Sequence, residues 1–276
     1  MKTTIVQDQP STSISGRRSI HAGSLPLSSA WLVKWFGWYG RRLLRKNFHL
    51  IRMSCDGPPP SVAGPMIIYL NHASWWDPMV ALFLQSEFFA ERRAFAPIDA
   101  SALRRYPFFR KLGFFGVEQK TVRGGVQFLR TAERILQHSN SVLWLTPQGR
   151  FADVRERPVH FEAGIAHLAA RLSNAHFVPL ALEYTFWEER YPEVLVHFGK
   201  PIPAFLYLKP TQAQHSLEGQ LEDVQDILSA KAKARRPADF NTLLGGSAGV
   251  GGIYDLWRGC RARWRGEKFK PAHGIL

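Results

Sequence analysis

Through the middle of the chain, short runs of apolar residues alternate with stretches in which apolar residues recur every three or four positions. The short runs predict buried strands at residues 66–70, 94–97, 142–145, 177–184 and 194–198. The wider spacing predicts helices at residues 78–85, 122–137, 163–172 and 211–236. Strands that alternate with helices are typical of an α/β fold, in which helices cover both faces of a sheet.

Residues 25–53 have a different pattern, in which aromatic and basic residues are interleaved. Apolar side chains recur at helical spacing, at Leu32, Trp35, Phe36, Tyr39 and Leu43. The other faces of such a helix carry most of the basic residues Lys34, Arg41, Arg42, Arg45 and Lys46. Trp31, Trp35 and Trp38 add amphipathic rings that favour a membrane interface. We predict an amphipathic helix lying in the membrane surface; the alternative is a helix packed on the protein core with solvated arginines.

These patterns divide the chain into four segments. Residues 1–24 are polar, lack the apolar run of a secretory signal, and are expected to form a disordered tail. Residues 25–56 are expected to form the interfacial helical segment. The rigid break Gly57-Pro58-Pro59-Pro60 marks the start of an α/β domain over residues 57–239. Residues 240–276 form a Gly-rich and then basic extension. No uncharged run reaches the roughly 20 residues that a spanning helix needs.

Composition and charge narrow the class of protein. Hydrophobic residues make up 45% and charged residues 21% of the 276, enough to bury a substantial core. The formal net charge of +14 predicts a polyanionic partner, which could be nucleic acid, an anionic bilayer or a phosphate-rich molecule such as coenzyme A. Cys55 and Cys260 form neither a paired-Cys metal motif nor a disulfide framework, so a reducing, cytoplasmic compartment is expected.

The segment Asn71-His72-Ala73-Ser74-Trp75-Trp76-Asp77-Pro78 carries the candidate chemistry. It falls where a buried strand ends and a helix begins, which is where ligands bind in open α/β sheets. A turn there lets the Asp77 carboxylate reach one imidazole nitrogen of His72, leaving the other nitrogen to take a proton from a substrate hydroxyl. The structural alternative is also open, because Asp77-Pro78 and the pair Ser74 and Asp77 are typical of a helix N-terminus.

This segment resembles the H-x-x-x-x-D block of the lysophospholipid acyltransferase family, also called the glycerolipid acyltransferases. Further blocks of that family follow in order. Residues 113–119 (GFFGVEQ) are similar to the second block, residues 146–151 (TPQGRF) to the third, and residues 178–180 (VPL) to the fourth. The likeness spans roughly residues 25–205, about two-thirds of the chain. It implies a mixed sheet flanked by helices.

The resemblance also implies an activity: direct transfer of a fatty acyl group from acyl-CoA or acyl-carrier protein to a lipid hydroxyl, without a cofactor or metal. His72 would be the general base and Asp77 would orient it. The implied substrate-binding residues are Asn71, Ser74, Glu118, Gln119, Gln148, Gly149, Arg150 and Pro179. The enzyme would act on the cytoplasmic face of the cell membrane, with an anionic membrane surface as its partner and no nucleic acid.

The third and second blocks depart from the family pattern. Gln119 replaces an arginine, Gln148 replaces the glutamate, Arg150 stands at the threonine position, and Phe151 replaces the second arginine. Those arginines would hold an acceptor phosphate, and neither an amide nor a phenyl ring offers the guanidinium fork that matches one. Arg150, Arg123 or Lys120 could compensate. Otherwise the acceptor is a sugar-bearing lipid, a carotenoid glycoside or an amino-acid lysolipid.

Two other interpretations compete. Residues 245–249 (GGSAG) match the G-x-S-x-G nucleophile motif, with Asp255 and His273 following in hydrolase order, but too little chain remains to build the strands that such a site needs. The second is a non-catalytic basic module that binds membrane or nucleic acid, in which the alternating Arg261, Arg263 and Arg265 dock on phosphates. No nucleic-acid motif supports it, and a basic tail suits lipid headgroups equally well.

Overall fold

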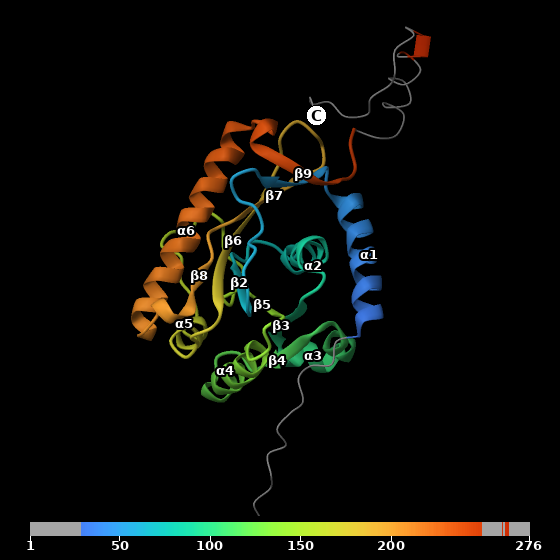
Figure 1. The fold of residues 1–276 in the computed structure, drawn as a ribbon. Coiled ribbons are helices and arrows are strands. Elements are labelled where there is room, and N and C mark those ends of the chain that lie inside the picture. The colour runs from blue at the N-terminus through green and yellow to red at the C-terminus, as the bar shows by residue number, and fades with distance from the viewer. Residues whose placement is uncertain (1–28, 250–260, 262, 265–276) are drawn as a thin grey trace, which may run out of the picture.

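A computed structural model describes residues 29–249, 261, 263 and 264. Its centre is a nine-stranded sheet in the order β4-β3-β5-β2-β6-β7-β1-β9, with β8 paired to β6 (Figure 1). The strands are β1 (Leu50–Ser54), β2 (Met66–Leu70), β3 (Arg93–Asp99), β4 (Phe114–Val117), β5 (Ser141–Leu145), β6 (His176–Thr185), β7 (Glu193–Phe198), β8 (Ile202–Pro203) and β9 (Phe240–Gly245).

Helices cover both faces of this sheet, as the alternating pattern predicts. They are α1 (Ala30–Asn47), α2 (Asp77–Phe88), α3 (Ala100–Arg105), α4 (Val122–Leu136), α5 (Gly164–Ala169) and α6 (Pro210–Ala234), with 3-10 helices η1 (Pro107–Leu112), η2 (Ala204–Leu206) and η3 (Pro237–Asp239). Figure 1 shows α1 and α2 on one side of the sheet and α5 and α6 on the other.

Five neighbouring strands run parallel, namely β4, β3, β5, β2 and β6. Their carboxyl ends therefore meet at one edge of the sheet, the position where α/β folds place ligands. Beyond β6 the direction changes, because β7 pairs antiparallel with β6 while β1 runs parallel to β7 and β9 antiparallel to β1. The sheet is thus mixed, which confirms the predicted fold class.

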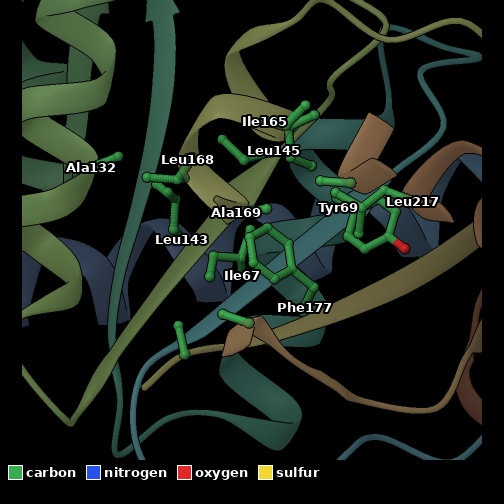
Figure 2. Close-up of a cluster of buried hydrophobic side chains, with 14 of the residues drawn as sticks. Ile67, Tyr69, Ala132, Leu143, Leu145, Ile165, Leu168, Ala169, Phe177 and Leu217 are labelled. Atoms are coloured by element: carbon green, nitrogen blue, oxygen red, sulfur yellow. The ribbon is translucent and has the colours of Figure 1, made fainter. Parts of the chain in front are cut away.

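The central strands are buried on both faces, which explains their unbroken apolar sequences. In β2, Ile67 and Tyr69 pack with α4, α5 and α6 in the cluster that Figure 2 shows. Their neighbours Met66, Ile68 and Leu70 pack on the opposite face with residues of α1 and α2. Successive strand residues point to opposite faces, so one short run serves both cores.

The segment boundaries differ from the sequence prediction at two places. The helical segment expected over 25–56 ends at Asn47, and residues 50–54 form strand β1 inside the sheet. Residues 240–245, expected to open a Gly-rich extension, form β9 against β1. Arg52 obscured the strand pattern of β1, since it is buried there in an ion pair with Glu193. The expected tail over 1–24 lies outside the described residues.

The G-x-S-x-G match is a helix cap. The Ser247 hydroxyl donates to the carbonyl oxygens of Arg45 and Lys46 in the last turn of α1. A Cβ on Gly246 would lie 2.2 Å from the carbonyl oxygen of Phe48, so only glycine fits this close approach. Asp255 and His273 lie outside the described residues. Among the described residues, the motif closes the end of α1 and builds no strand-turn-helix elbow.

Candidate active site

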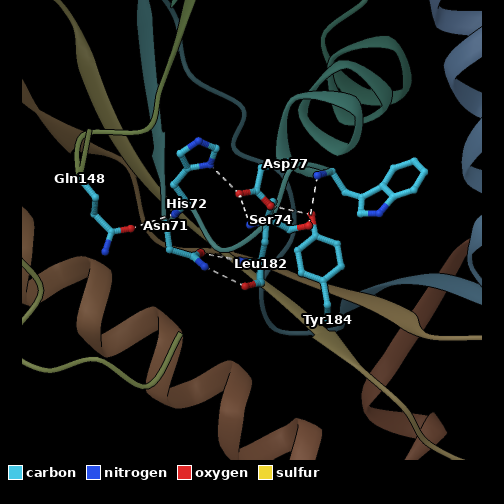
Figure 3. Close-up of polar contacts among 8 residues, drawn as sticks. Asn71, His72, Ser74, Asp77, Gln148, Leu182 and Tyr184 are labelled. Atoms are coloured by element: carbon cyan, nitrogen blue, oxygen red, sulfur yellow. Dashed lines mark hydrogen bonds and ion pairs between the residues drawn. The ribbon is translucent and has the colours of Figure 1, made fainter. Parts of the chain in front are cut away.

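The predicted pair forms at the junction of β2 and α2, with His72 in the connecting loop and Asp77 as the first residue of α2 (Figure 3). Nδ1 of His72 lies 2.7 Å from Oδ2 of Asp77. A carboxylate can only accept, so Nδ1 carries a proton, and in the neutral imidazole Nε2 presents the lone pair. Nε2 has no hydrogen-bond partner among residues 29–249, and the His72 side chain keeps 19% of its surface exposed. The geometry leaves one imidazole nitrogen available as a base.

The buried Asp77 carboxylate is held by three donors. Oδ2 accepts from Nδ1 of His72 and, at 3.0 Å, from the backbone N–H of Ser74. Oδ1 accepts at 2.6 Å from the hydroxyl of Tyr184, which comes from the end of β6. Burial raises the pKa of the Tyr184 phenol, and the charge of Asp77 raises it further, so the phenol stays a protonated donor. The carboxylate is therefore fixed in one orientation toward His72.

The Asn71 side chain anchors the same junction to strand β6. Its side-chain Nδ2 donates to the Leu182 carbonyl at 2.9 Å, and its Oδ1 accepts from the Leu182 N–H at 2.8 Å. The amide thus continues the hydrogen-bond ladder between β2 and β6 by one step past Leu70. Both polar groups are used on the backbone, so the predicted substrate contact of Asn71 is replaced by anchoring of the loop.

The third block clamps the backbone of His72. Oε1 of Gln148 accepts from the His72 N–H at 2.9 Å, and the Ala152 N–H donates to the His72 carbonyl at 2.8 Å. Gly149 between them has a φ of 64°, a left-handed conformation in which a side chain would also crowd Glu162. The structure therefore brings Gln148 and Gly149 to the pair, with Gln148 bonded to the backbone of His72.

An aromatic surface lies beside the His72 ring. The Phe151 ring centroid is 4.4 Å from that of His72, and 57% of Phe151 is exposed. The neighbouring Arg150 is also exposed, and its guanidinium forms an ion pair with Glu156. Ser74, predicted to contact substrate, accepts the Trp76 N–H at its hydroxyl and donates its own N–H to Asp77. The immediate surroundings of His72 are thus apolar or internally bonded.

Three predicted substrate residues lie farther away. Glu118 and the exposed Gln119 follow β4 at the same edge of the sheet, three strands from β2, which is about 14 Å at the usual strand spacing. Pro179 is buried inside β6 in register with Tyr69, and a Cβ on Gly199 would lie 2.6 Å from its ring. The structure gives Pro179 a packing role and does not bring it to the pair.

Sequence reasoning missed Tyr184. The residue ends the predicted strand 177–184, and nothing in one sequence shows that this strand lies next to 66–70. Parallel pairing of β2 with β6 places the carboxyl ends of both strands together and so brings the phenol to Asp77.

Comparisons with known proteins bear on the family and the fold. The Acyltransferase family profile matches residues 50–183. The fold is similar to the 1-acyl-sn-glycerophosphate (LPA) acyltransferase PlsC from Thermotoga maritima, with a TM-score of 0.50 and 14% identity over 72% of this chain and 80% of that one. Comparison with curated proteins returns no matching relative. Residues 50–183 of this chain thus match the Acyltransferase family, and its fold is similar to that of PlsC.

Proposed function

We propose that the enzyme moves a fatty acyl group from an acyl-CoA or acyl-carrier protein thioester to a hydroxyl of a lysophospholipid or related lipid. The observation that carries the proposal is the partly exposed His72, whose Nδ1 is held 2.7 Å from a buried Asp77 and whose Nε2 has no hydrogen-bond partner in the described part of the chain. This is the arrangement of a general base whose tautomer and protonated form are stabilised by a carboxylate. A module that only binds a membrane or a nucleic acid would not need this arrangement of His72 and Asp77.

The reaction uses one proton and no covalent enzyme intermediate. Nε2 of His72 takes the proton of the acceptor hydroxyl as its oxygen attacks the thioester carbonyl carbon. The new C–O bond forms, the C–S bond breaks, and the imidazolium returns the proton to the departing sulfur. Asp77 stabilises the imidazolium between the two transfers, because its buried carboxylate faces Nδ1.

The surroundings of His72 favour an acceptor without a phosphomonoester beside the reacting hydroxyl. Gln148 is already bonded to the His72 N–H, and Phe151 offers an apolar ring. The nearby cation, Arg150, is paired with Glu156. Within the third block, residues 146–151, a dianionic phosphate would therefore find no free guanidinium fork. An amphiphile with a neutral headgroup, such as a sugar-bearing lipid, matches these contacts better.

The exposed aromatic residues of the N-terminal helix α1 favour binding to a membrane surface. Trp31 and Trp38 on α1 are 72% and 60% exposed, an unusual state for the largest apolar side chains. At the other end of α1, the Phe48 ring contacts Trp76 at 5.1 Å and Tyr184 at 5.9 Å. A membrane bound by α1 would thus lie near the pair. No helix in the described part of the chain is sufficiently long and hydrophobic to span a bilayer.

The direct test is thiol release from acyl-CoA or acyl-carrier protein by the full chain, with a panel of acceptors in mixed micelles. We expect release only when a hydroxyl-bearing lipid is present, with a neutral-headed glycolipid turned over faster than lysophosphatidic acid. Mass spectrometry of the lipid product checks that an ester has formed. Release that does not depend on any lipid would indicate a thioesterase and contradict the proposal.

Tyr184→Phe should lower kcat about tenfold or more while leaving KM for both substrates unchanged. The change removes one of three donors to Asp77, and a hydrogen bond to a charged group is worth about 1.5–3 kcal/mol. The ring that packs on Phe48 remains, so folding should persist. Steady-state kinetics with wild type as reference measures the effect.

Tyr69→Phe is the matched control, since Tyr69 is also buried and its hydroxyl donates to Gln220 at 3.1 Å, away from the pair. This variant should keep the wild-type kcat. Equal losses in both variants, or a change in KM alone for Tyr184→Phe, would show that the phenol does not act through Asp77.

A further inference from the structure

A strongly cationic segment joins β3 to β4. Residues 100–117, which include α3 and η1, contain no acidic residue. They carry the exposed cations Arg104, Arg105, Arg110 and Lys111. None of these four forms an ion pair with another described residue. Apart from the attraction of Arg104 to Asp99, these four neighbouring like charges are not neutralised by ion pairs within the described part of the chain, which indicates an anionic partner outside the protein.

Exposed aromatic rings are interleaved with these cations. Tyr106 and Phe108 are 47% and 42% exposed, which leaves a large part of each ring in contact with solvent. Both rings contact Phe109, Tyr106 at 6.1 Å and Phe108 at 4.3 Å between centroids. Phe109 in turn packs on Phe114 of β4 at 5.3 Å. The exposed rings are therefore held on the sheet and do not belong to a loose loop.

The segment is continuous with the outer surface of α1. The Phe108 ring lies 6.1 Å from Phe36, and Phe36 lies 5.9 Å from Tyr39. Tyr39 stacks on Trp35 at 5.9 Å with an angle of 7° between the ring planes. The Ser29 N–H also donates to the Lys111 carbonyl at 2.8 Å. Figure 1 shows the first turns of α1 beside α3.

We propose that residues 104–111 are a second membrane-binding element, which inserts Tyr106 and Phe108 at the interface while its four cations bind anionic headgroups. The proposal rests on the proposed membrane association of α1. Aromatic rings with basic residues are the composition that proteins place at a bilayer surface. Two elements far apart in sequence would then form one docking surface, which fixes the orientation of the enzyme better than one helix can.

Other partners fit this surface less well. In a twofold contact between two copies, the same patch meets itself, so the cations of one copy would face those of the other. A single-stranded nucleic acid could neutralise the cations and stack its bases on Tyr106 and Phe108, but the sequence carries no nucleic-acid-binding motif. An anionic bilayer satisfies both features at once, because its headgroups and acyl chains meet at the depth where such rings lie.

Hydrogen–deuterium exchange of the full chain tests this without a substitution. We expect vesicles of phosphatidylcholine with phosphatidylglycerol to slow amide exchange in residues 104–111 as well as in α1. Phosphatidylcholine alone should protect both regions less. Protection confined to α1 would overturn the second element and leave the membrane association intact. No protection anywhere would contradict both.

Substitutions give the matching affinity test by vesicle sedimentation. Phe108→Ala with Arg110→Gln and Lys111→Gln should weaken binding to the anionic vesicles about tenfold or more. Trp31→Ala with Trp35→Ala and Trp38→Ala should weaken it too, as the α1 contribution. Phe205→Ala with Lys200→Gln and Lys209→Gln, an exposed ring and two cations near η2, is the control and should bind as wild type does.

Acyl transfer to a dispersed short-chain acceptor separates this proposal from the enzymatic one. The 108/110/111 variant should keep the wild-type rate there, because none of its three positions contacts the His72 loop. Unchanged vesicle binding by that variant would overturn the proposal. Self-association of the wild type that this variant abolishes, with no effect on lipid binding, would assign the surface to a second copy and would overturn it equally.

Discussion

His72→Ala is expected to lower acyl transfer by about three orders of magnitude in kcat, with thiol release falling in parallel. General-base catalysis by a positioned side chain contributes about 10²–10⁴-fold. The proposed proton acceptor is the Nε2 lone pair, which faces away from Asp77. Single-turnover measurement of the ester product distinguishes this loss from a change in product release.

The variant should still fold. The loop is held through the His72 backbone, whose N–H donates to Gln148 and whose carbonyl accepts from Ala152, and alanine keeps both groups. Asp77 loses one donor and retains the Ser74 N–H and the Tyr184 hydroxyl. A loss of activity at an unchanged thermal transition would therefore report chemistry and not unfolding.

His138→Ala is the matched control. His138 is exposed just before β5, at the amino ends of the parallel strands and so at the edge of the sheet opposite His72. Activity should be unchanged. If His72→Ala retained a wild-type rate of acyl transfer, the enzyme would not use this imidazole as a base, and the proposed mechanism would be wrong.

The pair could be predicted from sequence because its determinants are local. His72 and Asp77 are five positions apart, and one strand-to-helix turn brings them together. The unbroken apolar run of β2 and the first-turn proline of α2 mark both ends of that turn. A short-range contact of this kind depends on few torsion angles. The residue pattern and the family resemblance were therefore sufficient to predict it.

The supports of the pair could not be predicted, because they come from distant parts of the chain. Tyr184 is 107 positions from Asp77, and Leu182 is 111 from Asn71. Both contacts depend on the strand order, which hydrophobic periodicity does not encode. The resemblance pointed to Gln148 through the third block, yet the bond of its amide to the His72 N–H required coordinates.

Strand β1, near the β9 edge of the sheet, also could not be predicted from the sequence. Periodicity treated residues 25–56 as one helical segment, whereas β1 occupies 50–54 and pairs with both β7 and β9. From the sequence alone, Arg52 is expected to be exposed to solvent, but Glu193 on β7 neutralises its charge within the core. A buried ion pair between strands far apart in sequence hides a strand from any argument based on apolar positions alone.

Asp77→Asn should lower kcat by about 10²–10⁴-fold while the chain stays folded. The amide oxygen can still accept from the Ser74 N–H, and the amide nitrogen can donate to Tyr184, so the shape of the site persists. What disappears is the negative charge beside Nδ1, which stabilises the imidazolium formed when the acceptor hydroxyl is deprotonated. Steady-state kinetics should show the loss in kcat with little change in KM.

The alternative role of Asp77 is to stabilise the start of α2, where it lies in the first turn before Pro78. Asparagine serves helix starts nearly as well as aspartate, so this role predicts a stability change of about 1 kcal/mol or less and a normal rate. Asp99→Asn provides the comparison, because Asp99 caps α3 by accepting from Ser101 and Ala102 and does not touch His72. Equal, small effects of both substitutions would assign Asp77 to helix capping. A collapse of kcat in Asp77→Asn alone places its charge in the proton transfer.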